Sequence, residues 1–170
     1  VWSLSENDPR LIIPAHTEEI NSVCYSPDGQ RIATSGNNQV KLWNPTTGKM
    51  LLAIEGHDED VLCVTFSPDG QIIASASVDR QVKLWDTNTG TLKLTLRGNM
   101  QNINSIDFSP NGKRLVSGSN NGEILLWELT TGQEVMRLKG HNSDIYSIKF
   151  NPSGQYIVSS EFGEDVVKLW

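Results

Sequence analysis

Three side chains in the second quarter of the sequence are of the types that carry out hydrolysis in serine hydrolases: His57, Ser75 and Asp79, which lie with Trp85 in a stretch of 29 residues. In such enzymes a serine hydroxyl attacks the substrate, a histidine takes its proton and a carboxylate orients the histidine. The sequence has neither a Gly-x-Ser-x-Gly elbow nor a phosphate-binding glycine loop beside these residues. The hydrolase interpretation therefore depends on whether this set of residues is unique in the chain.

The same residue types recur along the chain with a fixed period. Five tryptophans are spaced 41 to 43 residues apart, at positions Trp2, Trp43, Trp85, Trp127 and Trp170. A turn with proline second and glycine fourth recurs in phase at residues 26–29, 67–70, 109–112 and 151–154. A third marker precedes each turn: Ala15-His16, Gly56-His57, Gly98-Asn99 and Gly140-His141. Three markers that hold their phase over four periods establish an internal repeat.

Each repeat predicts four short strands, and no window has helical periodicity. Strands rich in apolar and β-branched residues are predicted first, at 20–25, 61–66, 103–108 and 145–150. The second strands follow the proline turns, at 31–35, 71–77, 113–119 and 155–160. The third strands end at the tryptophans, over 40–43, 82–85, 124–127 and 167–170. The fourth strands are predicted at 11–13, 50–54, 92–96 and 134–138. The chain is therefore predicted to be all-β, with about sixteen strands.

A period of about 42 residues, with Gly-His before the first strand and Trp at the end of the third, resembles the WD-repeat β-propeller family. The Trp-Asp dipeptide itself occurs once, at Trp85-Asp86. The resemblance implies blades of four antiparallel strands, in which each repeat supplies the outer strand of one blade and three strands of the next. The repeats are placed at about 3–43, 44–85, 86–127 and 128–170, and residues 1–170 are expected to form one propeller domain or a part of one.

The resemblance also gives the four polar residues a structural role. WD repeats carry a tetrad in which a Trp N–H, a Ser hydroxyl, a His ring and an Asp carboxylate are linked in series, which His57, Ser75, Asp79 and Trp85 match. The other repeats hold graded versions of it: His16, Thr34, Asn37 and Trp43; Asn99, Ser117, Asn121 and Trp127; His141, Ser159 and Trp170 with Glu164 or Asp165 as the acid. Because an active site would be expected once rather than four times, the sequence predicts a structural network, no catalytic residue and no enzyme activity.

Charge and cysteine content narrow the classes of ligand. The net charge is −6, from 14 Lys and Arg against 20 Asp and Glu, which argues against nucleic acid or an anionic membrane as the main partner. Cys24, Cys63 and three scattered histidines fit neither a disulfide scaffold nor a zinc site. No apolar segment is long enough to span a membrane. We expect a cytoplasmic protein that binds no metal and no cofactor.

The expected partner surface is the end of the blades where the loop before each first strand meets the loop between the second and third strands. Its candidate binding residues are Glu18, Glu19, Asp58, Glu59, Asp60, Val78, Met100, Asn102, Asn120, Asp144 and Phe162. Six of these are acidic, against a single Arg80 in the same loops, so a protein or peptide partner with basic residues is expected. Binding of a small ligand or glycan at the channel mouth is the alternative, although Phe162 is the one aromatic residue predicted there.

Ring closure is the last expectation from the repeat. The pattern begins and ends at the same repeat position, Trp2 and Trp170, whereas propellers of this family usually have six to eight blades. Four blades would leave open edges that tend to aggregate. We therefore expect either two copies that close a ring of about eight blades or further repeats of a longer chain, with a tight four-bladed ring as the competing possibility.

Overall fold

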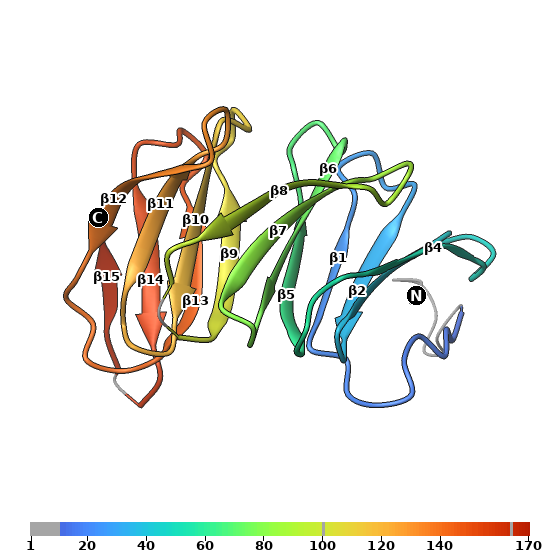
Figure 1. The fold of residues 1–170 in the computed structure, drawn as a ribbon, viewed down its shortest axis with the longest axis horizontal. Helices are drawn as coiled ribbons and strands as arrows, with labels where there is room; N and C mark the ends of the chain where they lie inside the picture. The colour runs from blue at the N-terminus through green and yellow to red at the C-terminus, as the bar shows by residue number, and fades with distance from the viewer. Residues whose placement is uncertain (1–10, 100, 164) are drawn as a thin grey trace, which may run out of the picture.

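The computed structural model describes residues 11–99, 101–163 and 165–170, and these fold into four antiparallel sheets arranged side by side in an open row (Figure 1). The first blade contains β1 (Ser22–Tyr25), β2 (Ile32–Gly36), β3 (Gln39–Trp43) and β4 (Met50–Glu55). The second contains β5 (Val61–Phe66), β6 (Ile72–Ser77), β7 (Gln81–Asp86) and β8 (Leu92–Arg97). The third contains β9 (Ile103–Phe108), β10 (Arg114–Ser119), β11 (Ile124–Glu128) and β12 (Gln133–Leu138). The fourth contains β13 (Ile145–Phe150), β14 (Ile157–Glu161) and β15 (Val167–Leu169).

The all-β prediction and the four-stranded antiparallel blades are confirmed, with a three-stranded blade at the C-terminal end. One predicted strand is wrong, because residues 11–16 contain no strand. A fourth strand forms only on a third strand that offers it a ladder of hydrogen bonds, and the residues around Trp2 lie outside the described residues. No helix among the described residues is long and apolar enough to cross a membrane.

The proline turns close as their sequence predicts. In the first blade the Gly29 N–H donates to the Ser26 carbonyl at 2.9 Å, and equivalent bonds close the turns of the other three blades. The glycine has a φ of 69°, a left-handed conformation that glycine adopts without steric cost. These turns join the first to the second strand of each blade, so they lie at the opposite end of the strands from the candidate partner loops.

The apolar core lies between blades. One cluster packs Leu84 and Leu96 of the second blade against Ile106, Phe108 and Trp127 of the third. Comparable clusters join the first blade to the second and the third to the fourth. Each sheet therefore buries its faces against its neighbours, and the first and last blades each keep one face without a neighbouring sheet.

The Gly-His marker has a packing reason. A Cβ atom added to Gly98 would lie 2.8 Å from Cη2 of Trp127, and one added to Gly140 would lie 2.8 Å from the same atom of Trp170. At these two positions a larger residue would push the tryptophan ring away, whereas in the first blade Ala15 fills the equivalent place and packs with Trp43. The glycine thus lets the ring of the third strand pack tightly against the backbone that leads into the histidine position.

The two ends of the row expose apolar side chains. Val23 and Tyr25 are exposed on β1 at one end, in blue in Figure 1, and Tyr146, Val167 and Leu169 are exposed at the other, in red. Within the core of a propeller these positions would face an adjacent blade. The row shown in Figure 1 is open, and its first and last blades lie at opposite ends of it.

Candidate functional site

The four polar residues of the second blade form one continuous hydrogen-bonded series. Trp85 Nε1 donates to Ser75 Oγ at 2.7 Å, and Ser75 Oγ lies 2.7 Å from His57 Nε2. His57 Nδ1 in turn lies 2.7 Å from Asp79 Oδ2. Asp79 also accepts the backbone N–H groups of Asp58 and Gln81. The series joins β7, β6, the loop before β5 and the turn after β6.

The protonation states of His57 and Asp79 determine which group donates in each hydrogen bond of the series. Burial lowers the pKa of His57 below its ordinary value, against the opposing effect of Asp79. Burial acts to raise the pKa of Asp79, but the hydrogen bond from His57 and the backbone donors outweigh it, and the pKa is lowered. A neutral His57 therefore donates from Nδ1 to an ionised Asp79 and accepts the Ser75 hydroxyl at Nε2.

Ser75 does not lie where a nucleophile would meet a substrate. The residue is fully buried, with 0% of its surface exposed. Its hydroxyl is held between the Trp85 indole and the His57 ring, both also buried. The geometry therefore gives His57, Ser75, Asp79 and Trp85 the bonding expected of a structural tetrad, and it gives no substrate access to the hydroxyl.

In the fourth blade Glu161 takes the place of the tetrad acid, and the expectation that Asp165 does so is wrong, whereas Glu164 lies outside the described residues. His141 Nδ1 lies 2.8 Å from Glu161 Oε1, while Ser159 Oγ lies 2.6 Å from His141 Nε2 and accepts Trp170 Nε1 at 2.8 Å. The hydrogen bond with His141, followed by that from Lys168, lowers the pKa of Glu161 to about 2. Glu161 ends β14 only two residues after Ser159, and its longer side chain covers the distance that an aspartate bridges from the following turn.

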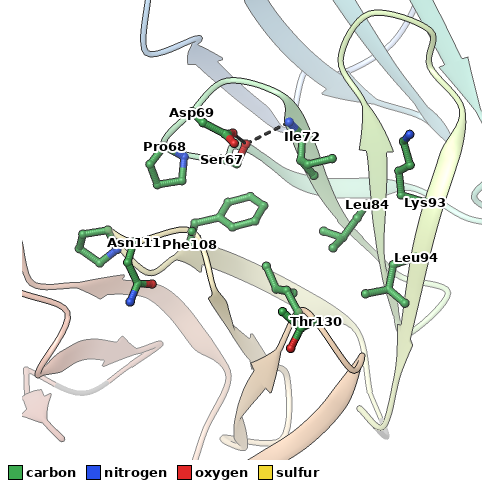
Figure 2. Close-up of a pocket in the computed structure, with 13 residues that line it drawn as sticks. Ser67, Pro68, Asp69, Ile72, Leu84, Lys93, Leu94, Phe108, Asn111 and Thr130 are labelled. Atoms are coloured by element: carbon green, nitrogen blue, oxygen red, sulfur yellow. Dashed lines mark hydrogen bonds between the residues drawn. The ribbon is translucent and has the colours of Figure 1, made fainter.

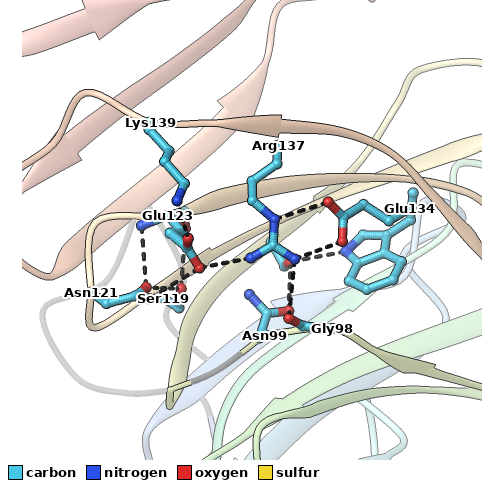
Figure 3. Close-up of polar contacts among 10 residues, drawn as sticks. Gly98, Asn99, Ser119, Asn121, Glu123, Glu134, Arg137 and Lys139 are labelled. Atoms are coloured by element: carbon cyan, nitrogen blue, oxygen red, sulfur yellow. Dashed lines mark hydrogen bonds and ion pairs between the residues drawn. The ribbon is translucent and has the colours of Figure 1, made fainter.

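The first and third blades hold shortened series. In the first, Thr34 Oγ1 accepts Trp43 Nε1 and lies 2.9 Å from His16 Nε2, and no hydrogen bond in the described residues joins Asn37 to His16. In the third, the series runs from Trp127 through Ser117 to Asn99 Oδ1. Asn121 does not continue it, because Asn121 bonds Ser119 and Glu123 within its own turn (Figure 3).

A cation beside each tetrad was not foreseen from the sequence. Lys41 donates to the Ala15 carbonyl at 3.0 Å, Lys83 donates to Gly56, and Lys168 donates to Gly140. In each case the carbonyl precedes the histidine. The available signal was the lysine two residues before Trp43, Trp85 and Trp170 in the sequence.

The third repeat has Leu125 at the lysine position, and the cation comes from another strand. Arg137 of β12 pairs with Leu125 in the register of the sheet, and its Nη2 donates to the Gly98 carbonyl at 3.3 Å. Glu134 and Glu123 hold the same guanidinium at 2.8 and 3.0 Å (Figure 3). The electrostatic role is thus kept while the residue that fills it changes strand.

The candidate partner loops meet as expected at one end of the blades. The Val78 N–H donates to the Asp60 carbonyl at 2.9 Å, and the Asn120 N–H donates to Asn102 at 3.0 Å. In the fourth blade the Phe162 N–H donates to the Asp144 carbonyl at 2.8 Å. Each bond links the loop before a first strand to the loop between the second and third strands of the same blade. Met100 lies outside the described residues.

Two pockets divide the acidic residues of these loops. Glu18, Glu19 and Asp60 line a pocket of about 340 Å³ together with Asn21 and Asn37, and none of the described residues that line it is basic. The negative charges therefore concentrate at the junction of the first two blades.

The second pocket is of mixed charge. Asp58, Glu59, Val78 and Asn102 line a space of about 640 Å³ with Arg80 and with Arg97, a basic residue that the sequence interpretation did not count. The two guanidinium groups offset the carboxylates there, so the first pocket carries the stronger negative bias. Asp144 and Phe162 line neither pocket, and the Phe162 ring is 69% exposed.

The described part of the chain contains no candidate metal site. No group of three or more His, Cys, Asp and Glu side chains is arranged there to hold a metal ion. Cys24 and Cys63 are free thiols, and burial raises the pKa of Cys24 to about 12. A thiol held protonated in this way is a poor nucleophile.

Comparisons with known proteins agree with this geometry. The family model described as "WD domain, G-beta repeat" matches residues 7–44, 48–86, 90–128 and 132–170. The chain is similar to Periodic tryptophan protein 2 homolog of Dictyostelium discoideum, with 45% identity over 49 residues, and to Transcriptional corepressor LEUNIG_HOMOLOG of Arabidopsis thaliana, with 33% identity over 49 residues. Each match covers 28% of this chain but only 5% and 6% of those proteins.

Proposed function

This chain belongs to the WD domain, G-beta repeat family, whose members serve in general as protein-interaction scaffolds, and we propose that it is itself a non-catalytic scaffold that binds a basic segment of a partner protein at its acidic loops. The binding site of this proposal is the end of the blades where Glu18, Glu19 and Asp60 share a pocket. One of the two relatives is named as a transcriptional corepressor. A cytoplasmic location is part of the same proposal.

The observation that carries the proposal is the one-sided charge of that pocket. Three carboxylates face a space of about 340 Å³, and the described part of the chain places no basic residue in its lining to neutralise them. All three side chains belong to exposed residues of loops fixed by backbone hydrogen bonds to their own blade or its neighbour, such as the bond from Val61 N–H to the Asn37 carbonyl. Such a pocket attracts lysine and arginine side chains and raises the rate of association with them.

The test is a binding titration with a capped decapeptide of alternating lysine and glycine. We expect binding that weakens as salt rises, because exposed charges are screened within about 10 Å at 0.1 M salt. The variant with Glu19→Lys, Asp60→Lys and Asp144→Lys is expected to lose this binding. The control reverses Asp28 and Glu128 at the other end of the strands and leaves the ion pair between Glu134 and Arg137 intact. Unchanged affinity in the first variant contradicts the proposal, as does an equal loss in the control.

A second copy of the chain is the partner we propose for the open ends of the row. Val23 and Tyr25 at one end and Tyr146, Val167 and Leu169 at the other expose apolar surface. Two copies related by a twofold axis would bury both ends at once and close a ring of eight blades. Small-angle scattering is then expected to give twice the mass of one chain, and a monomer mass at all concentrations would contradict the proposal.

Recognition of a glycan or small ligand at the same loops is the alternative function. It is favoured by aromatic side chains that stack on sugar rings, and Phe162 is the exposed aromatic residue among the candidates. A glycan array run beside the peptide titration separates the two functions. Binding to glycans with no binding to the lysine peptide would replace the proposed function by the alternative.

A further inference from the structure

A pocket of about 690 Å³ lies between the second and third blades, at the end of the strands opposite the acidic loops (Figure 2). Its volume lies in the range of sites that hold small ligands and peptide side chains. The lining is largely apolar and includes Ile72, Leu84, Leu94, Phe108 and Leu129. Asp69 and Lys93 stand at its edge (Figure 2).

The equivalent junction between the first and second blades is crossed by an arginine of the chain itself. Arg31 Nη1 donates to the Thr87 carbonyl at 3.2 Å, and Arg31 Nη2 donates to Asn88 Oδ1 at 2.7 Å. Arg31 directly precedes β2, the second strand of its blade, whereas Thr87 and Asn88 lie in the turn between the third and fourth strands of the next. A guanidinium group is therefore a ligand that this type of junction accommodates.

Ile72 occupies the position of Arg31 at the next junction. The backbone N–H of Arg31 donates to Ser26 Oγ at 2.9 Å, and that of Ile72 donates to Ser67 Oγ at 3.0 Å. Both residues follow their turn serine by five positions. Because isoleucine has no guanidinium group, the second junction lacks the bridge of the first.

The turn of the third blade presents the corresponding acceptor side. Leu129 and Thr130 follow Trp127 at the same distances as Thr87 and Asn88 follow Trp85, and both line the pocket. No side chain among the described residues donates to the Leu129 carbonyl as Arg31 does to that of Thr87. The carbonyl acceptor is thus present at Leu129, while Thr130 has no amide oxygen like that of Asn88 and the side chain that would donate to the carbonyl is missing.

Charge at the edge of the pocket favours a cation. Asp69 Oδ1 accepts the Ser67 hydroxyl at 2.6 Å and the Gln71 N–H at 3.0 Å, and the described residues place no donor on Oδ2. The hydrogen bond from Ser67 lowers the pKa of Asp69, so the group is charged at neutral pH. Lys93 at the edge is already paired with Asp86 at 3.2 Å. A partner's guanidinium would therefore meet an available carboxylate oxygen.

We propose that this pocket, here called the inter-blade pocket, binds an arginine side chain of a partner peptide that is flanked by aliphatic residues. The guanidinium takes the place that Arg31 fills at the first junction, between Asp69 and the turn at Leu129. A flanking aliphatic side chain covers Ile72 and Phe108. The site is separate from the acidic loops, because the two lie at opposite ends of the strands.

The probe is a capped, fluorescein-labelled hexapeptide with one arginine between two leucines, titrated by fluorescence polarisation. The comparison peptide replaces arginine by citrulline, which keeps the shape and removes the charge. We expect the citrulline peptide to bind about tenfold more weakly or worse, since a charged hydrogen bond contributes on the order of 1.5–3 kcal/mol. Equal binding of the two peptides would overturn the proposal.

Three variants locate the binding. Ile72→Arg supplies the missing side chain from within the chain, fills the inter-blade pocket and is expected to abolish binding, whereas Ile72→Val leaves the pocket open and keeps it. Asp69→Asn removes the charge and is expected to weaken binding about tenfold. Asparagine already occupies the equivalent turn position in the third blade, where Ser109 donates to Asn111 Oδ1 at 2.8 Å. We therefore expect the Asp69→Asn variant to fold normally.

The outcomes also separate this proposal from the function of the acidic loops. Charge reversal of Glu19, Asp60 and Asp144 is expected to leave the affinity for the arginine hexapeptide unchanged. Loss of binding in that variant, or full binding in both Ile72→Arg and Asp69→Asn, would overturn the inter-blade pocket as the site. Conversely, failure of the lysine decapeptide to bind leaves the hexapeptide result as it stands.

Discussion

His141 Nδ1 lies 2.8 Å from Glu161 Oε1, and neither side chain has any surface exposed to solvent. The carboxylate also accepts the backbone N–H groups of Asn142 and Ser143 at 2.7 and 2.9 Å, and Lys168 Nζ lies 2.9 Å from it. A buried charge is tolerated only when its hydrogen bonds are satisfied, and here both oxygens have donors. Glu161 therefore fixes the loop before β13 to the end of β14.

Removal of the charge at Glu161 is expected to flatten the acid dependence of stability. The pKa of Glu161 falls from 4.5 to about 2 on folding. A group whose pKa is lower in the folded state stabilises the fold above its unfolded pKa, and that contribution is lost as the pH falls from 4.5 to about 2. Urea denaturation of Glu161→Gln at several pH values should show lower stability at neutral pH and a shallower fall in this window. A fall as steep as that of the unchanged protein contradicts this role.

The tetrad histidine of the second blade is expected to make stability sensitive to mild acid. Burial holds the pKa of His57 below 6.5, so the unfolded chain binds a proton more readily. The contribution of His57 to the free energy of unfolding is therefore fully present above pH 6.5 and declines as the pH falls below that value. The variant His57→Asn should lose this part of the pH dependence and about 1–3 kcal/mol at neutral pH, since Asp79 loses a donor. Equilibrium unfolding followed by tryptophan fluorescence checks both effects.

The natural third blade gives a control for that substitution. Asn99 already occupies the histidine position and accepts the Ser117 hydroxyl at 3.1 Å, so an asparagine at position 57 has a local precedent. If His57→Asn instead unfolds the protein completely, the prediction of a loss of about 1–3 kcal/mol is wrong.

The tetrad geometry was predictable because the sequence resembles WD repeats, in which the members of the tetrad hold fixed positions. Trp85, Ser75 and His57 are connected as predicted because each lies on a regular strand or directly before one. Glu161 was missed because the segment after Ser159 carries one extra residue, so counting along the chain points to the wrong acid. The length of the glutamate side chain, which spacing does not reveal, decides which residue reaches His141.

Contacts between side chains of different strands or blades could not be predicted from the sequence for a different reason. Arg137 stands in for a lysine absent at Leu125, and only the register of β11 with β12 places the two side by side. Arg97 lines the second loop pocket from the last residue of β8, the outer strand of its blade, whereas the strand predicted from the sequence ended at residue 96. In both cases the folded structure brings a positive charge to a place that the sequence pattern does not indicate.

Arg137 is expected to stabilise the third blade through its carbonyl and carboxylate contacts. Substitution to methionine keeps much of the aliphatic stem and removes the donors to Gly98, Glu134 and Glu123. Because the Arg137 side chain is 30% exposed, solvent screening limits the loss to about 1 kcal/mol. Lys139→Met is the matched control: its ammonium also pairs with Glu123 but is 71% exposed, so a change within about 0.5 kcal/mol is expected. Equal effects on the denaturation midpoint would show that the carbonyl contact contributes nothing.

The hydroxyl of Ser75 is expected to matter for stability and not for any hydrolytic activity. Ser75→Ala leaves Trp85 Nε1 without its acceptor and His57 Nε2 without its donor, and each buried polar group left unpaired costs about 1–3 kcal/mol. Ser35 on β2 offers a matched control, because it is equally buried and its hydroxyl has no hydrogen-bond partner in the described residues. Ser35→Ala should therefore change the free energy of unfolding little. Chemical denaturation of both variants measures the stability losses, and esterase and peptidase assays measure any hydrolytic activity. Equal stability losses in the two variants would contradict a stabilising role of the tetrad. A hydrolytic rate that depends on Ser75 would support the enzyme interpretation instead.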